Sequence, residues 1–81
     1  MSAVPTLFIV EGYRFFFFAN EGPRPHVHVE KGDGAAKLWL DAIAIERWMN
    51  LTAAQRRRIL KLVKVHRLVL LKGWNEFFSS K

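Results

Sequence analysis

The pattern of apolar and polar residues begins with two apolar runs that predict a β-hairpin. Leu7–Val10 and Tyr13–Ala19 are separated by Glu11-Gly12, a pair typical of the tight turn between antiparallel strands. The second run contains four consecutive phenylalanines, and a strand places such residues alternately on its two faces. One helix covers only one face of a sheet, so the other pair of rings predicts contact with a second chain, in a homodimer or a stable heterocomplex.

A second hairpin follows a loop at Asn20–Pro25. Histidine and valine alternate from His26 to Val29, and Gly32-Asp33-Gly34 then provides a turn into a fourth strand at Ala35–Leu40. Ala42–Trp48 fits either a strand or a helical turn, and its alternating isoleucines favour a short strand or extended segment.

The last third of the chain predicts one long amphipathic helix. Thr52-Ala53-Ala54-Gln55 has the spacing of a capping box, and the helix is expected to run to about Lys72 or beyond. At about 100° per residue, one arc of this helix is apolar and should face the sheet. That arc consists of Ile59, Leu62, Val63, His66, Val69 and Leu70, joined by Phe77 if the helix continues through Gly73.

These elements predict a single α+β domain over residues 1–81, with a mainly antiparallel sheet of four or five strands and one long C-terminal helix on one face. The chain has no cysteine, which excludes disulfides and thiolate metal sites and fits a reducing cytoplasm. It shows neither a signal peptide nor an apolar stretch of membrane-spanning length, so we expect a soluble, intracellular protein.

Charge is distributed unevenly along the chain. The first 46 residues hold four basic and six acidic side chains, whereas the remaining residues hold nine basic and one acidic. This asymmetry indicates an acidic partner for the C-terminal half, although a solvated basic helix face gives the same pattern. Within Arg56-Arg57-Arg58, three consecutive helical residues spread over about 200° and cannot form one phosphate clamp.

His26, His28 and Glu30 share one face of the predicted third strand. Imidazoles near neutral pKa can act as general acid or base, and with the carboxylate they could also hold a metal, with His66 completing the set. Both histidines can equally be structural. For His66, which lies within the apolar arc, a hydrogen-bonded core histidine is the favoured interpretation.

The chain resembles a small bacterial family of domains of unknown function, numbered 4160. The resemblance rests on Pro25–Val29, Gly12–Phe16, Ala36–Leu40 and Leu70–Asn75, and it covers nearly the whole chain. It implies a two-gene arrangement beside a second small protein, of the family numbered 2442, in a pair resembling a toxin and its antitoxin. The family commonly has two adjacent prolines before the first histidine; here Arg24 separates them and adds a cation beside His26.

We therefore expect a component of a bacterial toxin-antitoxin-like module that binds a small protein partner, with RNA as a further target. As catalytic candidates, His26 and His28 would cleave RNA by acid-base chemistry, with no metal or other cofactor. The anion-binding candidates are Arg14, Arg24, Lys37, Arg57, Lys61 and Lys64, and the partner-interface candidates are Phe16, Phe18, Trp39, Leu60, Leu68 and Leu71.

Two alternatives remain open at this stage. One is a non-catalytic protein-interaction domain of the antitoxin type, which would use the phenylalanine strand and the basic helix. The other is a His-x-His metal-binding module. The sequence does not decide whether any reaction is catalysed.

Overall fold

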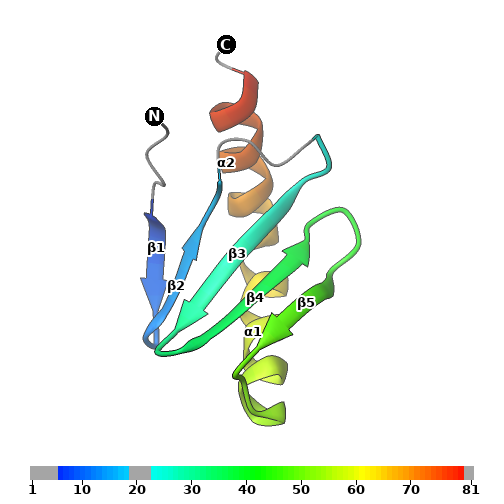
Figure 1. The fold of residues 1–81 in the computed structure, drawn as a ribbon. Coiled ribbons are helices and arrows are strands. Elements are labelled where there is room, and N and C mark those ends of the chain that lie inside the picture. Colours follow the sequence, from blue (N-terminus) through cyan, green and yellow to red (C-terminus); the bar gives the residue numbers. More distant parts are fainter. Residues whose placement is uncertain (1–5, 19–22, 80–81) are drawn as a thin grey trace.

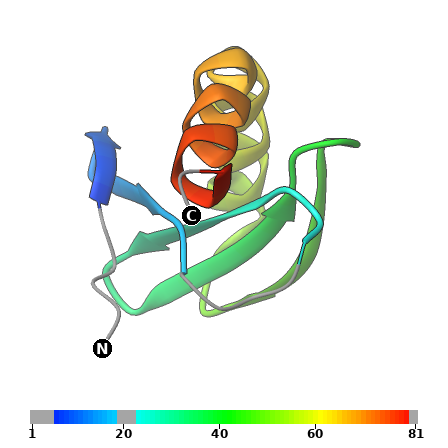
Figure 2. The same ribbon diagram turned by 90° about the horizontal axis from the view of Figure 1, so that it is seen from above.

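The fold has two layers, with two helices lying against one face of a five-stranded antiparallel sheet (Figures 1 and 2). The computed structural model of the protein describes residues 6–18 and 23–79. Its elements are β1 (Thr6–Val10), β2 (Tyr13–Phe16), β3 (His26–Lys31), β4 (Gly34–Trp39), β5 (Ala44–Met49), α1 (Ala53–Val65) and α2 (Arg67–Ser79).

Strand order in the sheet follows the sequence, β1-β2-β3-β4-β5, and every neighbouring pair is antiparallel. The α+β class and the antiparallel sheet are thus confirmed, and the ambiguous segment at Ala42–Trp48 contributes most of β5. Of the predicted Asn20–Pro25 loop, residues 20–22 lie outside the described residues. No helix in the described part of the chain is long and apolar enough to cross a membrane.

Both predicted hairpin turns are present. Glu11 and Gly12 have φ angles of 54° and 81°, and two consecutive positive values are what a type I′ turn requires. The second turn connects Lys31 to Gly34 in the β3–β4 register, with Gly32 at φ 57° as its first central residue. These turns set the registers that place alternate residues of β2, β3 and β4 toward the helices.

The core lies between the sheet and the helices. Phe15 and Phe17 point into it and are 0% exposed, while Phe16 and Phe18 lie on the opposite face, as alternation predicts. Buried residues from both layers complete the core, among them Val27, Val29, Leu38, Ile59, Val63, Leu70 and Trp74.

The prediction of one long helix is wrong in one respect, because the helix is interrupted at His66. This residue has φ −98° and ψ 13°, which ends α1, and α2 starts at the next residue. The His66 Nδ1–H donates to the carbonyl oxygen of Leu62 at 2.8 Å, and the His66 backbone N–H uses the same oxygen at 3.0 Å. A side chain that shares an i−4 carbonyl with the backbone is a recognised cause of helix bending.

Several side chains on the helices lie on a different side from the one predicted. Val69, predicted to face the sheet, is 61% exposed. Leu70 and Trp74 are buried against the sheet instead, and Val69 is about 100° away from Leu70 around the helix. Leu60 and Leu71, expected on the outer surface, are partly buried against the core. The predicted capping box at Thr52 and Gln55 is confirmed by both of its hydrogen bonds.

Candidate functional site

The candidate site is the face of the sheet that the helices do not cover, which we call the open face (Figure 2). Cross-strand pairing places its side chains in two rows over four strands. One row runs through Arg14, Glu30, Ala35 and Met49, and the other through Phe16, His28, Lys37 and Arg47. The alternation of β2 to β4 therefore brings several of the predicted site residues together, including Trp39 on β4.

Aromatic rings form a cluster on the side of the open face nearest β2. The Phe16 and His28 rings are stacked with centroids 5.5 Å apart, and Phe18 meets His28 edge-on at 4.5 Å. The Arg14 guanidinium lies 4.2 Å from the Phe16 centroid, so Phe16 is only 2% exposed. Phe18, at 36% exposed, is the ring of this cluster most accessible to a partner.

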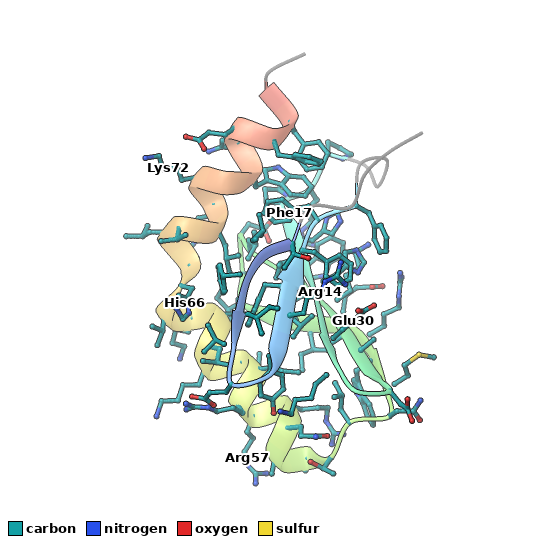
Figure 3. The ribbon with its side chains drawn as sticks, turned by 90° about the vertical axis from the view of Figure 1, so that its left-hand side faces the viewer. Arg14, Phe17, Glu30, Arg57, His66 and Lys72 are labelled. Atoms are coloured by element: carbon teal, nitrogen blue, oxygen red, sulfur yellow. The ribbon has the colours of Figure 1, made fainter. Side chains whose placement is uncertain are left out.

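Most arginines on and around the open face are paired with carboxylates. Arg14 contacts Glu30 at 2.8 Å, and in Figure 3 these two residues lie on the side of the sheet away from the helices. Arg24 makes a bidentate pair with Asp41 and lies 4.0 Å from the Trp39 ring. The anion-binding candidates Arg14 and Arg24 thus each lie beside a carboxylate that balances the positive charge.

The Arg24–Asp41 pair leads to a prediction for pH dependence. Hydrogen bonding from Arg24 lowers the pKa of the Asp41 carboxyl below its ordinary value, and the Ala42 backbone N–H adds to the effect. Folding lowers the pKa of the Asp41 carboxyl, so the ion pair stabilises the folded protein. This stabilisation is complete above the pKa that Asp41 has in the unfolded chain, and it is lost as the pH falls through the lower pKa of the folded protein.

We expect a carboxyl NMR titration to show this lowered pKa, and Arg24→Gln to raise it toward the ordinary value. Glu11 provides a matched control, since its pKa is lowered by Arg58 instead and should not respond to Arg24→Gln. An Asp41 pKa at its ordinary value in the unsubstituted protein would contradict the pairing.

A hollow of about 230 Å³ lies on the open face between the aromatic cluster and β5. The β5 side of this site was not predicted, because the pattern of Ala42–Trp48 fits either a strand or a helical turn and so does not define which side chains share a face. The cross-strand pairing of Lys37 with Arg47 depends on a register shift between β4 and β5, for which the sequence carries no signal. Lining residues are Phe16, Phe18, His28, Val29, Glu30, Ala35, Ala36, Lys37, Arg47, Trp48 and Met49.

The two catalytic candidates have different environments. His26 is 0% exposed, its Nδ1–H donates to the Arg24 carbonyl oxygen at 2.8 Å, and its ring lies 4.7 Å from that of Trp74 on α2. Because His26 is buried, a bound molecule could reach its ring only if neighbouring groups moved aside. His28 is 8% exposed and borders the hollow, which leaves it as the one histidine of the pair that a bound molecule could approach.

The histidine row does not extend into a metal-binding cluster. His66 packs beside Phe8, with ring centroids 5.0 Å apart, and Phe8 also contacts Phe15 in the core. His66 is therefore on the helix side of the sheet and does not join His28. Over residues 6–18 and 23–79, no three His, Cys, Asp or Glu side chains gather in a way that could hold a metal ion.

A separate set of cations lies on the outer side of α1. Arg57, Lys61 and Lys64 are exposed, and none of them has an ion pair within the part of the chain that the structure describes (Figure 3 labels Arg57). We call these three residues the basic stripe. Arg56 instead stacks 3.8 Å from the Trp48 ring, and Arg58 pairs with Glu11, so the three consecutive arginines point in different directions as predicted.

These features define a small two-layer α+β domain with a chemically distinct surface on each layer. The chain belongs to the family described as Domain of unknown function (DUF4160), whose sequence model matches residues 12–75. The matched region runs from the first turn to near the middle of α2, so the predicted family membership is confirmed. No curated protein and no solved structure matches this chain.

Proposed function

We propose that this chain is one component of a bacterial, cytoplasmic two-protein module of the toxin-antitoxin kind, and that it binds its small protein partner through the open face. One observation carries the proposal: the arginines on this face are balanced by neighbouring carboxylates, while an apolar hollow beside them stays accessible. Phe18 and Met49, at 36% and 59% exposed, border that hollow from opposite sides. A nearly neutral surface with accessible aromatic and thioether groups is typical of protein interfaces.

Co-expression with the neighbouring gene product tests this proposal. We expect the two proteins to copurify, and growth to differ between expression of either one alone and expression of both. The double variant Phe18→Ser/Met49→Ser should weaken the complex at least about tenfold, because truncation of buried interface anchors commonly costs more than 1 kcal/mol. Both side chains are partly or largely exposed in the free protein, so the fold should persist, which circular dichroism can verify.

Leu68→Ser is the matched comparison, since Leu68 is 78% exposed on the helix layer. If that substitution abolished copurification while the open-face double variant did not, the partner interface would lie on the helices and the open-face proposal would fail. If the two proteins formed no complex, the proposal of a two-protein module would be wrong.

RNA binding is a second candidate function, and the basic stripe is the observation that favours it. Its three cations lie on one side of α1 and none forms an ion pair with a described carboxylate, in contrast to Arg14 and Arg24 on the open face. Glu11 is the nearby carboxylate, and its pKa is lowered by its hydrogen bond from Arg58 and also by the charge of Lys61. Each phosphate that such a cation neutralises releases counterions, so binding falls steeply with salt.

We expect single-stranded RNA to bind at low salt, and replacement of Arg57, Lys61 and Lys64 by glutamine to flatten the salt dependence. Three lost phosphate contacts reduce the slope of log K against log salt by roughly 2, at about 0.7 per phosphate for single strands. Arg24→Gln is the control, because its charge is already paired with Asp41. Binding that does not depend on salt, or an unchanged slope in the triple variant, would exclude this candidate.

A further inference from the structure

Three large aliphatic side chains lie together on the outer surface of the helices. Val65, Leu68 and Val69 are 69%, 78% and 61% exposed. Helical hydrogen bonding continues across the break at His66, because the Leu70 N–H donates to the His66 carbonyl oxygen at 2.9 Å. Residues three and four positions apart therefore lie on one side of the helices, as these three do. We call these three side chains the aliphatic ridge. Small soluble domains seldom leave such a cluster uncovered.

The ridge is continuous with a groove between β1 and α2. This groove has a volume of about 300 Å³, and Val69 belongs to both features. Leu7 and Phe8 of β1 form one wall, and residues of α2 form the other. The ridge and the groove together make an apolar surface on the helix layer, separate from the hollow on the open face.

Lysines lie along the helix side of this apolar surface. Lys61 and Lys64 precede Leu68 by seven and four residues and Lys72 follows it by four, so helical spacing places all three along the ridge. All three are exposed and have no ion pair among the described residues, and Lys72 points away from the sheet in Figure 3. The chain from Ala53 to Gly73 contains seven basic residues and no acidic one. Glu76 is the one carboxylate that lines the groove.

We propose that the aliphatic ridge and its groove bind an acidic amphipathic helix of another protein. Apolar residues repeating every three or four positions on that helix would cover Val65, Leu68 and Val69, while its flanking carboxylates would lie opposite Lys61, Lys64 and Lys72. This inference does not rest on the proposed open-face interface, because the two surfaces belong to different layers of the fold.

Charge distinguishes among the molecules that could cover the ridge and the groove. A second copy of this chain would bring a second set of lysines against the first, and the net charge of +6 adds to that repulsion. Nucleic acid would be attracted to the lysines but would offer the exposed aliphatic groups little apolar surface to cover. An acidic amphipathic helix satisfies both the charge and the apolar surface.

The test is a titration of the full chain with a fluorescently labelled helical peptide that carries leucines at positions i, i+3, i+4 and i+7 and glutamates on the flanks. We expect binding, with backbone amide NMR shifts confined to residues 61–73 and the facing side of β1. Leu68→Ser/Val69→Ser should raise Kd about tenfold or more, because both are central apolar contacts that are exposed in the free protein. Lys61→Gln/Lys64→Gln should raise Kd by a smaller factor and reduce its salt dependence.

Two control peptides separate apolar recognition from general attraction to a basic protein: one keeps the glutamates but has serines for the leucines, and one keeps the leucines but has lysines for the glutamates. Both should bind much more weakly. Met49→Ser, on the opposite layer, should leave the affinity for the acidic peptide unchanged. Equal binding of either control peptide, shifts located on the open face, or a homodimer that Leu68→Ser dissociates would each overturn the inference.

Discussion

Phe17→Ala is expected to lower the free energy of unfolding by about 3–5 kcal/mol, the usual cost of removing a fully buried phenylalanine. Phe17 is 0% exposed, and its ring meets those of Trp74, Phe77 and Phe78 on α2 at centroid distances of 5.4, 6.0 and 6.4 Å. Because it connects the sheet to α2, the cavity would loosen the second helix first. Since small domains have a total stability of roughly 5–15 kcal/mol, this one change removes a large part of it.

Chemical denaturation followed by circular dichroism measures this effect. Phe18→Ala is the control, since Phe18 is adjacent in sequence but points to the open face and is 36% exposed. We expect Phe18→Ala to cost much less stability and to act mainly on partner binding. Equal loss of stability in the two variants would contradict the assignment of their faces.

Gly34→Ala is the second substitution expected to have a large effect. A Cβ atom at this position would lie 2.3 Å from Cδ2 of Leu51 and 2.6 Å from the backbone oxygen of Asn50. Leu51 is 6% exposed and Asn50 has φ 54°, so neither can move away freely. Overpacking of this kind costs about 1–3 kcal/mol, which corresponds to a fall in Tm of roughly 5–20 °C for a domain of this size.

Gly73→Ala makes the matched comparison because it should act in the opposite direction. Gly73 lies within α2, and a Cβ there would meet the Phe17 ring at 3.6 Å, an ordinary contact distance. Replacing a helical glycine by alanine should stabilise the protein by about 0.5–1 kcal/mol. Thermal unfolding of both variants checks the pair, and a Tm unchanged by Gly34→Ala would show that the β4 start is less constrained than described.

Features that depend on local sequence were predicted correctly. The turn at Glu11-Gly12 and the capping box at Thr52 each follow from backbone and side-chain chemistry within a few residues. Alternation along the phenylalanine run also predicted the faces correctly, because the side-chain period of a strand is fixed. These features determine most of the fold.

Features that depend on partners far apart in sequence were not predicted. Arg58 and Glu11 are separated by 47 positions, and Arg24 and Asp41 by 17, so neither pairing could be predicted, and Arg24 remained an anion-binding candidate. The burial of His26 against Trp74 likewise arises only when α2 packs at the end of the sheet. The interruption at His66 coincides with a side-chain hydrogen bond to Leu62, which helical periodicity does not reveal.

The sequential order of the strands has a consequence for how this chain folds during synthesis. Each strand after β1 pairs with the one made just before it, so contacts within the sheet are local and can form rapidly as successive hairpins. The helices that cover Phe15 and Phe17 are made after the sheet, and the roughly thirty residues from the end of β5 to the end of α2 take about 2–6 s to emerge at usual translation rates. During that interval the apolar side of a nascent sheet is uncovered, so truncation before α1 should yield an aggregation-prone product.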